Sequence, residues 1–174
     1  MAFAFTVDDL LEYSDWERAE WHRWFLEQGQ PALAVDLGPN NNGRIRTIGE
    51  LVRHIFSAEK RYVERCRKAP LTDTSAISAD DVEALFNFGD ESRRALRELL
   101  AAFPDEEWDA SREMSFGTYT GLVSCRKMIL QAITHEFRHW AQIAAFLRQA
   151  GYKPGFHDVI ASPLFDVPGR VSTS

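Results

Sequence analysis

Apolar residues recur at helical spacing in four long segments of the chain, and little of it alternates like a strand. Steps of three and four keep side chains on one face of a helix, whereas strict alternation lines one face of a strand. The pattern therefore predicts four amphipathic helices, over residues 7–28, 48–69, 79–103 and 121–150.

Capping and helix-breaking residues predict where these helices start and stop. A hydroxyl residue followed three positions later by an acid, the spacing of a capping box, precedes the first three helices: Thr6 and Asp9, Thr47 and Glu50, Ser78 and Asp81. Pro70 and Pro104 stop the second and third helices. Gly151 is expected to end the fourth in the left-handed conformation.

The connections between the helices predict the architecture. Long helices with polar connections predict an all-α fold, a four-helix bundle in up-and-down order or with long crossovers. Residues 104–119 are too many for a tight turn, so we expect a short hairpin or a docked loop there. The proline-containing tail, residues 152–174, is expected to wrap the bundle as extended chain. At this length the chain is most simply a single domain, residues 1–174.

The chain is acidic, with a net charge of −6 and a pI near 5.4. Nucleic-acid binders present a basic surface to phosphates, so we expect no nucleic-acid partner. No apolar run approaches the roughly 20 residues of a membrane span, and the N-terminus turns acidic at once, unlike a signal peptide. Two cysteines, Cys66 and Cys125, do not make a disulfide framework. These features predict a cytoplasmic protein with reduced thiols and no membrane partner.

Basic residues crowd the end of the second predicted helix: Lys60, Arg61, Arg65, Arg67 and Lys68. Cations stabilise a helix C-terminus, so a solvated helix end explains the cluster. The alternative is an anion site that attracts the carboxylates of a substrate.

Two histidines four residues apart, His135 and His139, lie in the fourth predicted helix. They belong to a stripe of inward-facing positions at steps of three and four: Met128, Ala132, His135, His139, Ile143 and Phe146. Two buried imidazoles side by side need partners, and one divalent metal ion satisfies both. The pair therefore indicates a metal site.

A durable metal site needs a third ligand, and His54 is the best candidate. It lies on an inward stripe of the second predicted helix, which consists of Leu51, His54, Ala58 and Tyr62. We expect the second and fourth helices to run in the same direction and to line the core together. A lone histidine on an apolar face is more often a core residue than a ligand, and the inward pair opposite it favours the ligand.

The remaining histidines and the cysteines are weaker candidates. His22, near the end of the first helix, could be a fourth ligand, but a hydrogen-bonded or partly exposed histidine is the favoured interpretation. His157, in the tail, is assigned no role. Cys125 lies about 15 Å from His135 along the helix axis, and Cys66 lies farther still from His54.

Three neutral imidazoles leave coordination positions open for water or substrate, as in a catalytic site. The bound ion would acidify a water or a thiol. Zinc and nickel both suit imidazole, and the sequence does not choose between them.

The segment His135-Glu136-Phe137-Arg138-His139 also matches H-E-x-x-H, the zincin protease pattern in which the glutamate is the general base. A zincin finds its third ligand downstream, where this chain has His157 and acids in a proline-rich tail. One residue along a helix is a rotation of about 100°, so Glu136 should point well away from the histidines. It is a weak catalytic candidate, and we expect it to pair with a neighbouring helix.

The chain resembles the DinB-like superfamily of metal-binding four-helix bundles in two motifs. The first is a histidine early in the second helix, in Glu50-Leu-Val-Arg-His54-Ile-Phe-Ser-Ala-Glu59, and the second, late in the chain, is His135-Glu-Phe-Arg-His139-Trp-Ala-Gln142-Ile. The resemblance covers roughly residues 6–160 and implies that His54, His135 and His139 are the metal triad. Trp140-Ala141 replaces the Arg-Gly that the family often has after the last histidine. Better understood members of this superfamily use low-molecular-weight thiols such as bacillithiol or mycothiol, and many have no established activity.

These features favour a metal-dependent enzyme, a thiol S-transferase that acts on small electrophilic molecules with one divalent ion, zinc or nickel, and a low-molecular-weight thiol. One alternative is a non-catalytic metal-binding or stress-response protein. Another is a metal-dependent hydrolase that uses Glu136.

A homodimer is also expected, because the chain has more aromatic side chains than one bundle core readily absorbs: Trp16, Trp21, Trp24, Phe25, Phe137 and Trp140. Proteins that resemble this family are often dimers. The alternative is that the 104–119 loop and the tail cover these side chains.

Overall fold

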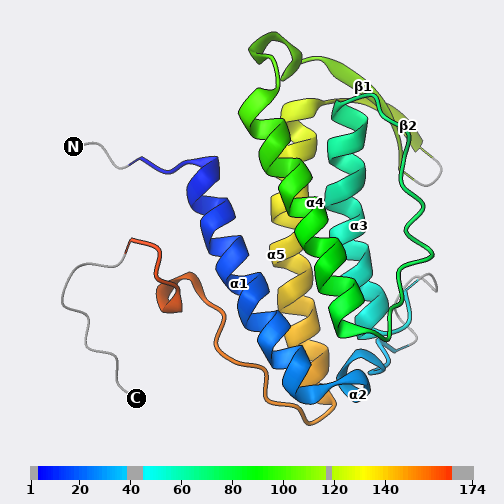
Figure 1. Cartoon of the computed structure of the whole chain (residues 1–174), viewed down its shortest axis with the longest axis vertical. Helices are drawn as coiled ribbons and strands as arrows, with labels where there is room; N and C mark the ends of the chain where they lie inside the picture. Colours follow the sequence, from blue (N-terminus) through cyan, green and yellow to red (C-terminus); the bar gives the residue numbers. More distant parts are fainter. Residues whose placement is uncertain (1–3, 39–44, 117–118, 166–174) are drawn as a thin grey trace.

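A computed structural model of the chain describes residues 4–38, 45–116 and 119–165 (Figure 1). The helices in this part of the chain are α1 (Val7–Gln28), α2 (Gln30–Leu33), α3 (Ile48–Cys66), α4 (Val82–Ala102) and α5 (Cys125–Gln149). An antiparallel hairpin consists of β1 (Ser111–Phe116) and β2 (Tyr119–Ser124), and the 3-10 turns are η1 (Asp105–Glu107) and η2 (Val159–Ala161). The protein is therefore mostly helical, with one small sheet in the described residues.

The four long helices lie side by side, and α2 closes one end of them (Figure 1). α3 packs extensively against α4 and α5, whereas α1 contacts α4 and α5 over smaller surfaces. The hairpin lies at the opposite end from α2, where α3 and α4 end and α5 begins (Figure 1). No helix in the described ranges combines the length and the apolarity that crossing a membrane demands.

The directions of the helices differ from a simple up-and-down order. α3 and α4 run the same way, because the segment 67–81 crosses back along the molecule before α4 begins (Figure 1). About 15 extended residues reach roughly 50 Å, more than the length of α3. α3 and α5 are consequently antiparallel, so the expectation that they run in the same direction is wrong. Both helices still line the core, because side chains on the facing sides of two helices come into contact whether the helices are parallel or antiparallel.

The ends of three helices also correct the sequence prediction. α5 begins at Cys125 and not at 121, because residues 119–124 pair with β1 in the register Phe116↔Tyr119 to Ser111↔Ser124. Ser124 then caps α5 by accepting a hydrogen bond from the backbone N–H of Lys127. The hairpin expected in 104–119 is present but extends further along the chain.

α4 begins at Val82, with Asp81 as its N-cap in place of Ser78. α3 ends at Cys66 and not at 69, since Lys68 adopts a positive φ of 56°.

A layer of buried charge divides the core. On the α2 side, aromatic rings fill the space between the helices: Trp21, Phe25, Phe56, Phe86 and Trp140. On the hairpin side, aliphatic and sulfur side chains do so: Leu11, Val63, Leu96, Leu99, Met128 and Ile133. Between the two clusters lie the buried side chains of Arg18, Glu59, Arg93 and Glu136.

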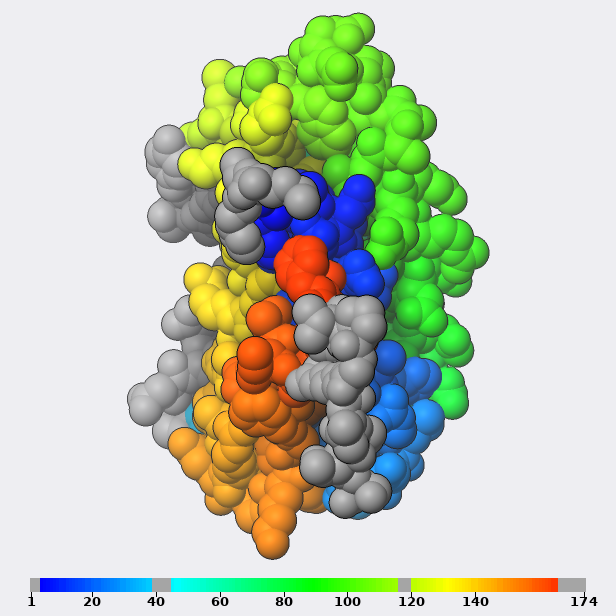
Figure 2. Space-filling model, turned by 90° about the vertical axis from the view of Figure 1, so that its left-hand side faces the viewer, coloured from blue at the N-terminus to red at the C-terminus, as the bar shows by residue number. Residues whose placement is uncertain are grey.

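The core and the tail account for most of the aromatic side chains that led us to expect a homodimer. Trp21, Phe25 and Trp140 are at most 1% exposed. The tail crosses the surface between α1 and α5 (Figure 2), where Trp24 donates a hydrogen bond to the carbonyl of Lys153. The core therefore covers three of these side chains and the tail contacts a fourth, and the homodimer stays a prediction.

Candidate metal centre

Three imidazoles meet between α3 and α5. His54 comes from α3, and His135 and His139 lie one turn apart on α5. Nε2 of His135 lies 3.1 Å from Nε2 of His54 and 3.1 Å from Nε2 of His139. Among the described residues, this is the only group of three or more histidine, cysteine or acidic side chains that is close enough to hold a metal ion.

One hydrogen bond sets the tautomer of His139. Its Nδ1 lies 2.9 Å from Oε1 of Gln142, and an amide oxygen only accepts, so Nδ1 has the proton. The lone pair of Nε2 then points at the other rings. Nε2 of His135 has two nitrogen neighbours, and a single N–H can point at only one of them.

A divalent cation fits this arrangement. Imidazole nitrogens bound to one ion at about 2.0–2.1 Å lie about 3.3 Å apart in tetrahedral geometry. Two of the separations here are 3.1 Å, and all three nitrogens lie within 4.8 Å of one another. Lone pairs of the three Nε2 atoms that point at one another repel, and one proton on His135 Nε2 can bridge to only one neighbour. A bound cation attracts all three lone pairs at once.

The environment keeps the three rings neutral. Burial, followed by the neighbouring ring of His139 and the cations Arg61 and Arg138, lowers the pKa of His54 to about 4. Burial and the two neighbouring rings lower the pKa of His135 to about 3. Burial also lowers the pKa of His139, although its hydrogen bond to Gln142 opposes the shift. Metal ligands must be deprotonated, so these rings are ready to bind at neutral pH.

The model of one protein family, described as the DinB family, matches residues 4–164. The chain belongs to the DinB family. The match spans the four long helices and all three histidines, so the resemblance noted in the sequence is confirmed. A comparison with curated proteins finds no match.

Glu136, the acid of the H-E-x-x-H segment, lies in the buried charge layer. Arg18 donates to both of its oxygens, Nε to Oε1 at 2.5 Å and Nη2 to Oε2 at 2.8 Å. Arg93 donates to Oε2 at 2.9 Å, and the indole N–H of Trp140 donates to Oε1 at 3.1 Å. Despite burial, these donors hold the pKa of Glu136 well below its usual range. The carboxylate of Glu136 therefore forms ion pairs in the core with Arg18 of α1 and Arg93 of α4, as expected for pairing with a neighbouring helix.

The same two arginines share Glu59 of α3. Arg18 Nη2 lies 2.9 Å and Arg93 Nη2 lies 3.0 Å from its Oε2. Two cations and two anions thus join all four long helices in one buried cluster. In this DinB family protein, the cluster fixes α5 one residue away from His135 and fixes α3 five residues away from His54.

A cavity of about 420 Å³ opens beside His54. α3 lines it with Glu50, Arg53, Ser57 and Arg61, and the crossover adds Asp73 and Thr74. Nη1 of Arg53 donates to the carbonyl of Ile77 at 2.8 Å, and Arg61 donates to the hydroxyl of Thr74 at 3.3 Å. The hydroxyl of Ser57 is buried and has no hydrogen-bond partner within the described residues. Beside His54 the cavity therefore offers two arginines held by hydrogen bonds, two carboxylates and a hydroxyl without a partner.

A second cavity, of about 390 Å³, lies further along α3 and α5 under the hairpin. Its walls are mainly apolar: Tyr62, Met114, Leu122, Val123 and Met128. Gln131, one turn before His135, also lines it, so it begins about 6 Å from the triad along α5.

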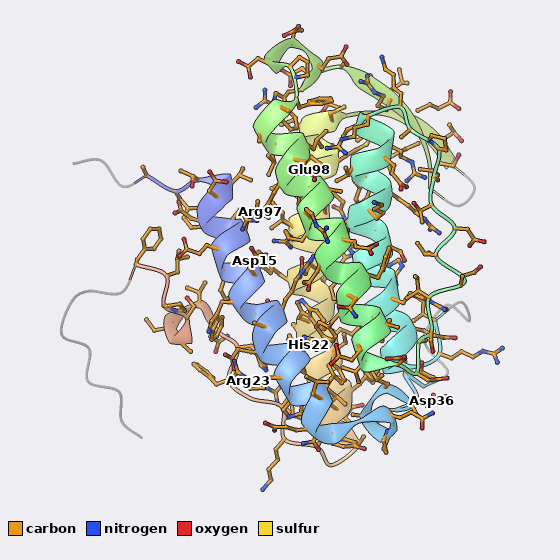
Figure 3. All side chains as sticks on the ribbon, in the orientation of Figure 1. Asp15, His22, Arg23, Asp36, Arg97 and Glu98 are labelled. Atoms are coloured by element: carbon orange, nitrogen blue, oxygen red, sulfur yellow. The ribbon has the colours of Figure 1, made fainter. Side chains whose placement is uncertain are left out.

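The other sequence candidates lie elsewhere. His22 stacks on Phe86 and faces Glu83 of α4 at 3.6 Å, and Figure 3 shows it on α1 beside α4. It is not a fourth member of the histidine group. His157 stacks on Trp21, and Cys66 and Cys125 are buried as free thiols, with Cys66 Sγ 3.9 Å from the carbonyl of Cys125.

Sequence patterns missed several of these residues. Of the basic cluster at the end of α3, only Arg61 lines the cavity beside His54, whereas Arg67 pairs with Glu98 of α4. Arg53 and Ser57 flank His54 by one and three residues, which is the signal that could have identified them. The inward positions of Arg18, Glu59 and Arg93 had no such signal, because charged residues are expected on solvent-facing stripes.

Proposed function

We propose that this protein is a metal-dependent thiol S-transferase that acts on small electrophiles. In this proposal, α1, α3, α4 and α5 form the family's four-helix bundle, and His54, His135 and His139 hold one divalent ion, zinc or nickel. The observation that supports it most is the convergence of three neutral imidazole nitrogens beside an open cavity. When bound, such an ion supplies Lewis acidity that lowers the pKa of a thiol.

The cavity beside His54 suits the thiol. Bacillithiol and glutathione have both carboxylates and an amino group. Arg53 and Arg61 present cations in fixed positions for the carboxylates, and Glu50 and Asp73, which line the same cavity, present carboxylates for the amino group. The buried hydroxyl of Ser57 can bond a further polar group of the same molecule. These residues would orient the sulfur toward the triad.

The cavity under the hairpin suits the electrophile. Its apolar walls favour a small hydrophobic carbon skeleton over a charged one. In the transfer, the thiol releases its proton to solvent water, its sulfur bonds to the electrophilic carbon, and the leaving group departs with the electron pair of the bond that breaks. Because His54 lines the first cavity and the second begins one turn before His135, the two cavities would bring the reactants together near the triad.

Hydrolysis with Glu136 as the base has less support. A general base must reach the attacking water with a free lone pair, within about 3.2 Å. Both oxygens of Glu136 instead accept hydrogen bonds from Arg18, Arg93 and Trp140. The buried cluster gives Glu136 a structural role.

Thiol consumption tests the proposal. Metal-loaded protein should consume bacillithiol, mycothiol or glutathione in the presence of an electrophile from a panel of alkyl and aryl halides and epoxides. Arg61→Met should lower kcat/KM about tenfold, mainly through KM, because it removes a charge-assisted contact. Lys60→Met, the neighbouring cation outside the cavity, should leave kcat/KM unchanged.

If the protein binds metal stoichiometrically yet no thiol is consumed with any electrophile, the transferase proposal fails. The non-catalytic metal-binding protein would then be the better interpretation.

A further inference from the structure

A separate cavity of about 240 Å³ lies between α1, α5 and the tail. α5 lines it with Phe137, Trp140, Ala141 and Arg148. At about 100° per residue, these positions fall on the face of α5 opposite His135 and His139. The cavity therefore has no part in the candidate metal centre.

Polar atoms without partners converge on this cavity. Glu17 and Trp21 line it from α1, and His157 lines it from the tail. Glu17 Oε2, Trp21 Nε1 and both ring nitrogens of His157 are buried, and none has a hydrogen-bond partner within the described residues. Glu17 is only 6% exposed and Trp21 is fully buried. The indole N–H of Trp21 only donates, and it lies close enough to Glu17 to lower the pKa of that carboxyl. The buried atoms that still need a donor are Glu17 Oε2 and one ring nitrogen of His157, so the cavity suits a ligand with donor groups.

The tail holds the cavity closed. The hydroxyl of Tyr13 donates to the backbone carbonyl of His157 at 2.6 Å. The ring of His157 stacks on Trp21 with centroids 4.2 Å apart and planes 5° apart. The tail is therefore held against α1 by the hydrogen bond from Tyr13 and by the stacking of His157 on Trp21.

Acids outnumber bases among the side chains that line the cavity, with Glu17 and Asp158 against Arg148. Burial and the carboxylates of Glu17 and Asp158 raise the pKa of Tyr13. Burial, followed by Glu136 and Asp158, raises the pKa of Glu17 to about 8, although Trp21 and Arg18 oppose the shift. Arg148 is the one arginine among the lining residues that the structure describes, and no lysine lines the cavity. A cationic ligand would relieve this repulsion.

The acids at this cavity suit an organic cation and not a metal ion. The histidine triad is the only metal-holding group found in the described residues, so Glu17, Asp158 and His157 do not come together as a metal site would require. An ammonium group instead needs only a carboxylate and a neutral acceptor nearby, and its carbon chain contacts aromatic walls favourably.

We propose that this cavity binds a small protonated primary amine, with the carboxylate of Glu17 as its counter-ion and a ring nitrogen of His157 as a second acceptor. The volume is below that of sites for drug-sized ligands, so the amine has a short carbon chain. The site does not depend on the metal or on the proposed transferase activity.

Calorimetric titration of the full-length, metal-loaded protein with propylammonium chloride tests this site. Binding is expected, and 1-propanol, which is neutral and of similar shape, should not bind. Glu17→Gln should weaken propylammonium binding about tenfold or more, since it removes a buried counter-charge. Glu20→Gln, on the same helix and paired with Arg23, is the matched control and should bind as the native protein does.

Two further measurements distinguish amine binding at Glu17 from amine binding at the histidine triad or at the surface. At neutral pH, binding should release a proton from Glu17, which appears as a dependence of the measured heat on the ionisation enthalpy of the buffer. The variant His135→Ala/His139→Ala should bind propylammonium normally. Absence of binding at millimolar amine, or equal binding by Glu17→Gln and Glu20→Gln in samples with native circular dichroism, would overturn the proposal.

Discussion

At the scale of single residues, burial sets the protonation of the groups that matter for binding. His54 and His135 have pKa values of about 4 and 3, below the ordinary value of 6.5, because burial and neighbouring rings disfavour the imidazolium. Glu17 shows the opposite consequence of burial, since its neutral form is favoured up to about pH 8. Both shifts lead to tests of stability against pH.

The metal-free protein should lose stability in acid through these histidines. In the unfolded chain they take up protons near pH 6.5, whereas in the fold they do so only near pH 4 and 3. The stability that the two neutral histidines contribute to the fold is therefore fully present above pH 6.5 and is lost as the pH falls toward 3. Urea unfolding between pH 7 and 4 should show a shallower loss for His54→Gln/His135→Gln than for the native chain. Equal slopes would contradict this assignment.

Glu17→Gln should stabilise the protein at alkaline pH. The folded pKa is about 8 and the ordinary value is 4.5, so native stability falls as the pH rises from 4.5 and the loss is complete above 8. Glutamine does not ionise, so at pH 9 the variant should exceed the native protein by on the order of 2–4 kcal/mol. The difference should vanish near pH 5, as urea unfolding at both pH values can establish. A native protein whose stability does not change over this window would refute the burial argument.

At the scale of elements, the buried charge layer and the crossover hold the helices in place. Arg18 of α1 and Arg93 of α4 bind Glu59 of α3 and Glu136 of α5. Figure 3 shows a related contact at the surface, where Asp15 of α1 faces Arg97 of α4. Because a buried ion pair costs desolvation, its removal is most harmful when one partner remains.

Glu136→Gln should therefore destabilise the fold by about 3–5 kcal/mol, because it leaves two buried arginines with Glu59 as their single buried carboxylate, beside the more exposed Asp15 that pairs with Arg93. Its metal content should remain native in the folded fraction, since Glu136 is not one of the clustered ligand candidates and its carboxylate accepts hydrogen bonds from Arg18, Arg93 and Trp140. Thermal unfolding and metal analysis of the same sample measure both effects. Native stability with loss of a hydrolytic activity would instead support a catalytic base.

Gly49→Ala should separate α3 from the crossover. A Cβ at Gly49 would lie 1.8 Å from the backbone carbonyl oxygen of Ala79, so the segment before α4 must move. Overpacking of this kind costs about 1–3 kcal/mol or more. At Gly155, in the tail, an added Cβ would lie 3.5 Å from its nearest neighbour, which is an ordinary van der Waals contact. Gly155→Ala is therefore the control, and its melting temperature should equal that of the native protein. Equal melting temperatures for the two variants would contradict this close contact.

At the scale of the whole molecule, periodicity predicts much of the fold and of the histidine cluster. The stripes that contain His54, His135 and His139 follow from steps of three and four, and the structure brings these histidines together. The parallel course of α3 and α4 could not be predicted, because a long polar segment such as 67–81 is compatible with either helix direction. The start of α5 was missed because the pairing of β2 with β1 is a contact between segments, which the spacing of 119–124 does not reveal.

Metal content tests the central claim most directly. The protein purified at neutral pH should contain one divalent ion, and His135→Ala/His139→Ala should contain almost none, because only one imidazole remains. His22→Ala, which removes a histidine that faces α4, is the matched control and should keep the native content. Elemental analysis of the three proteins provides the result. Stoichiometric metal in the folded double variant, or equal loss in His22→Ala, would show that the ion binds elsewhere.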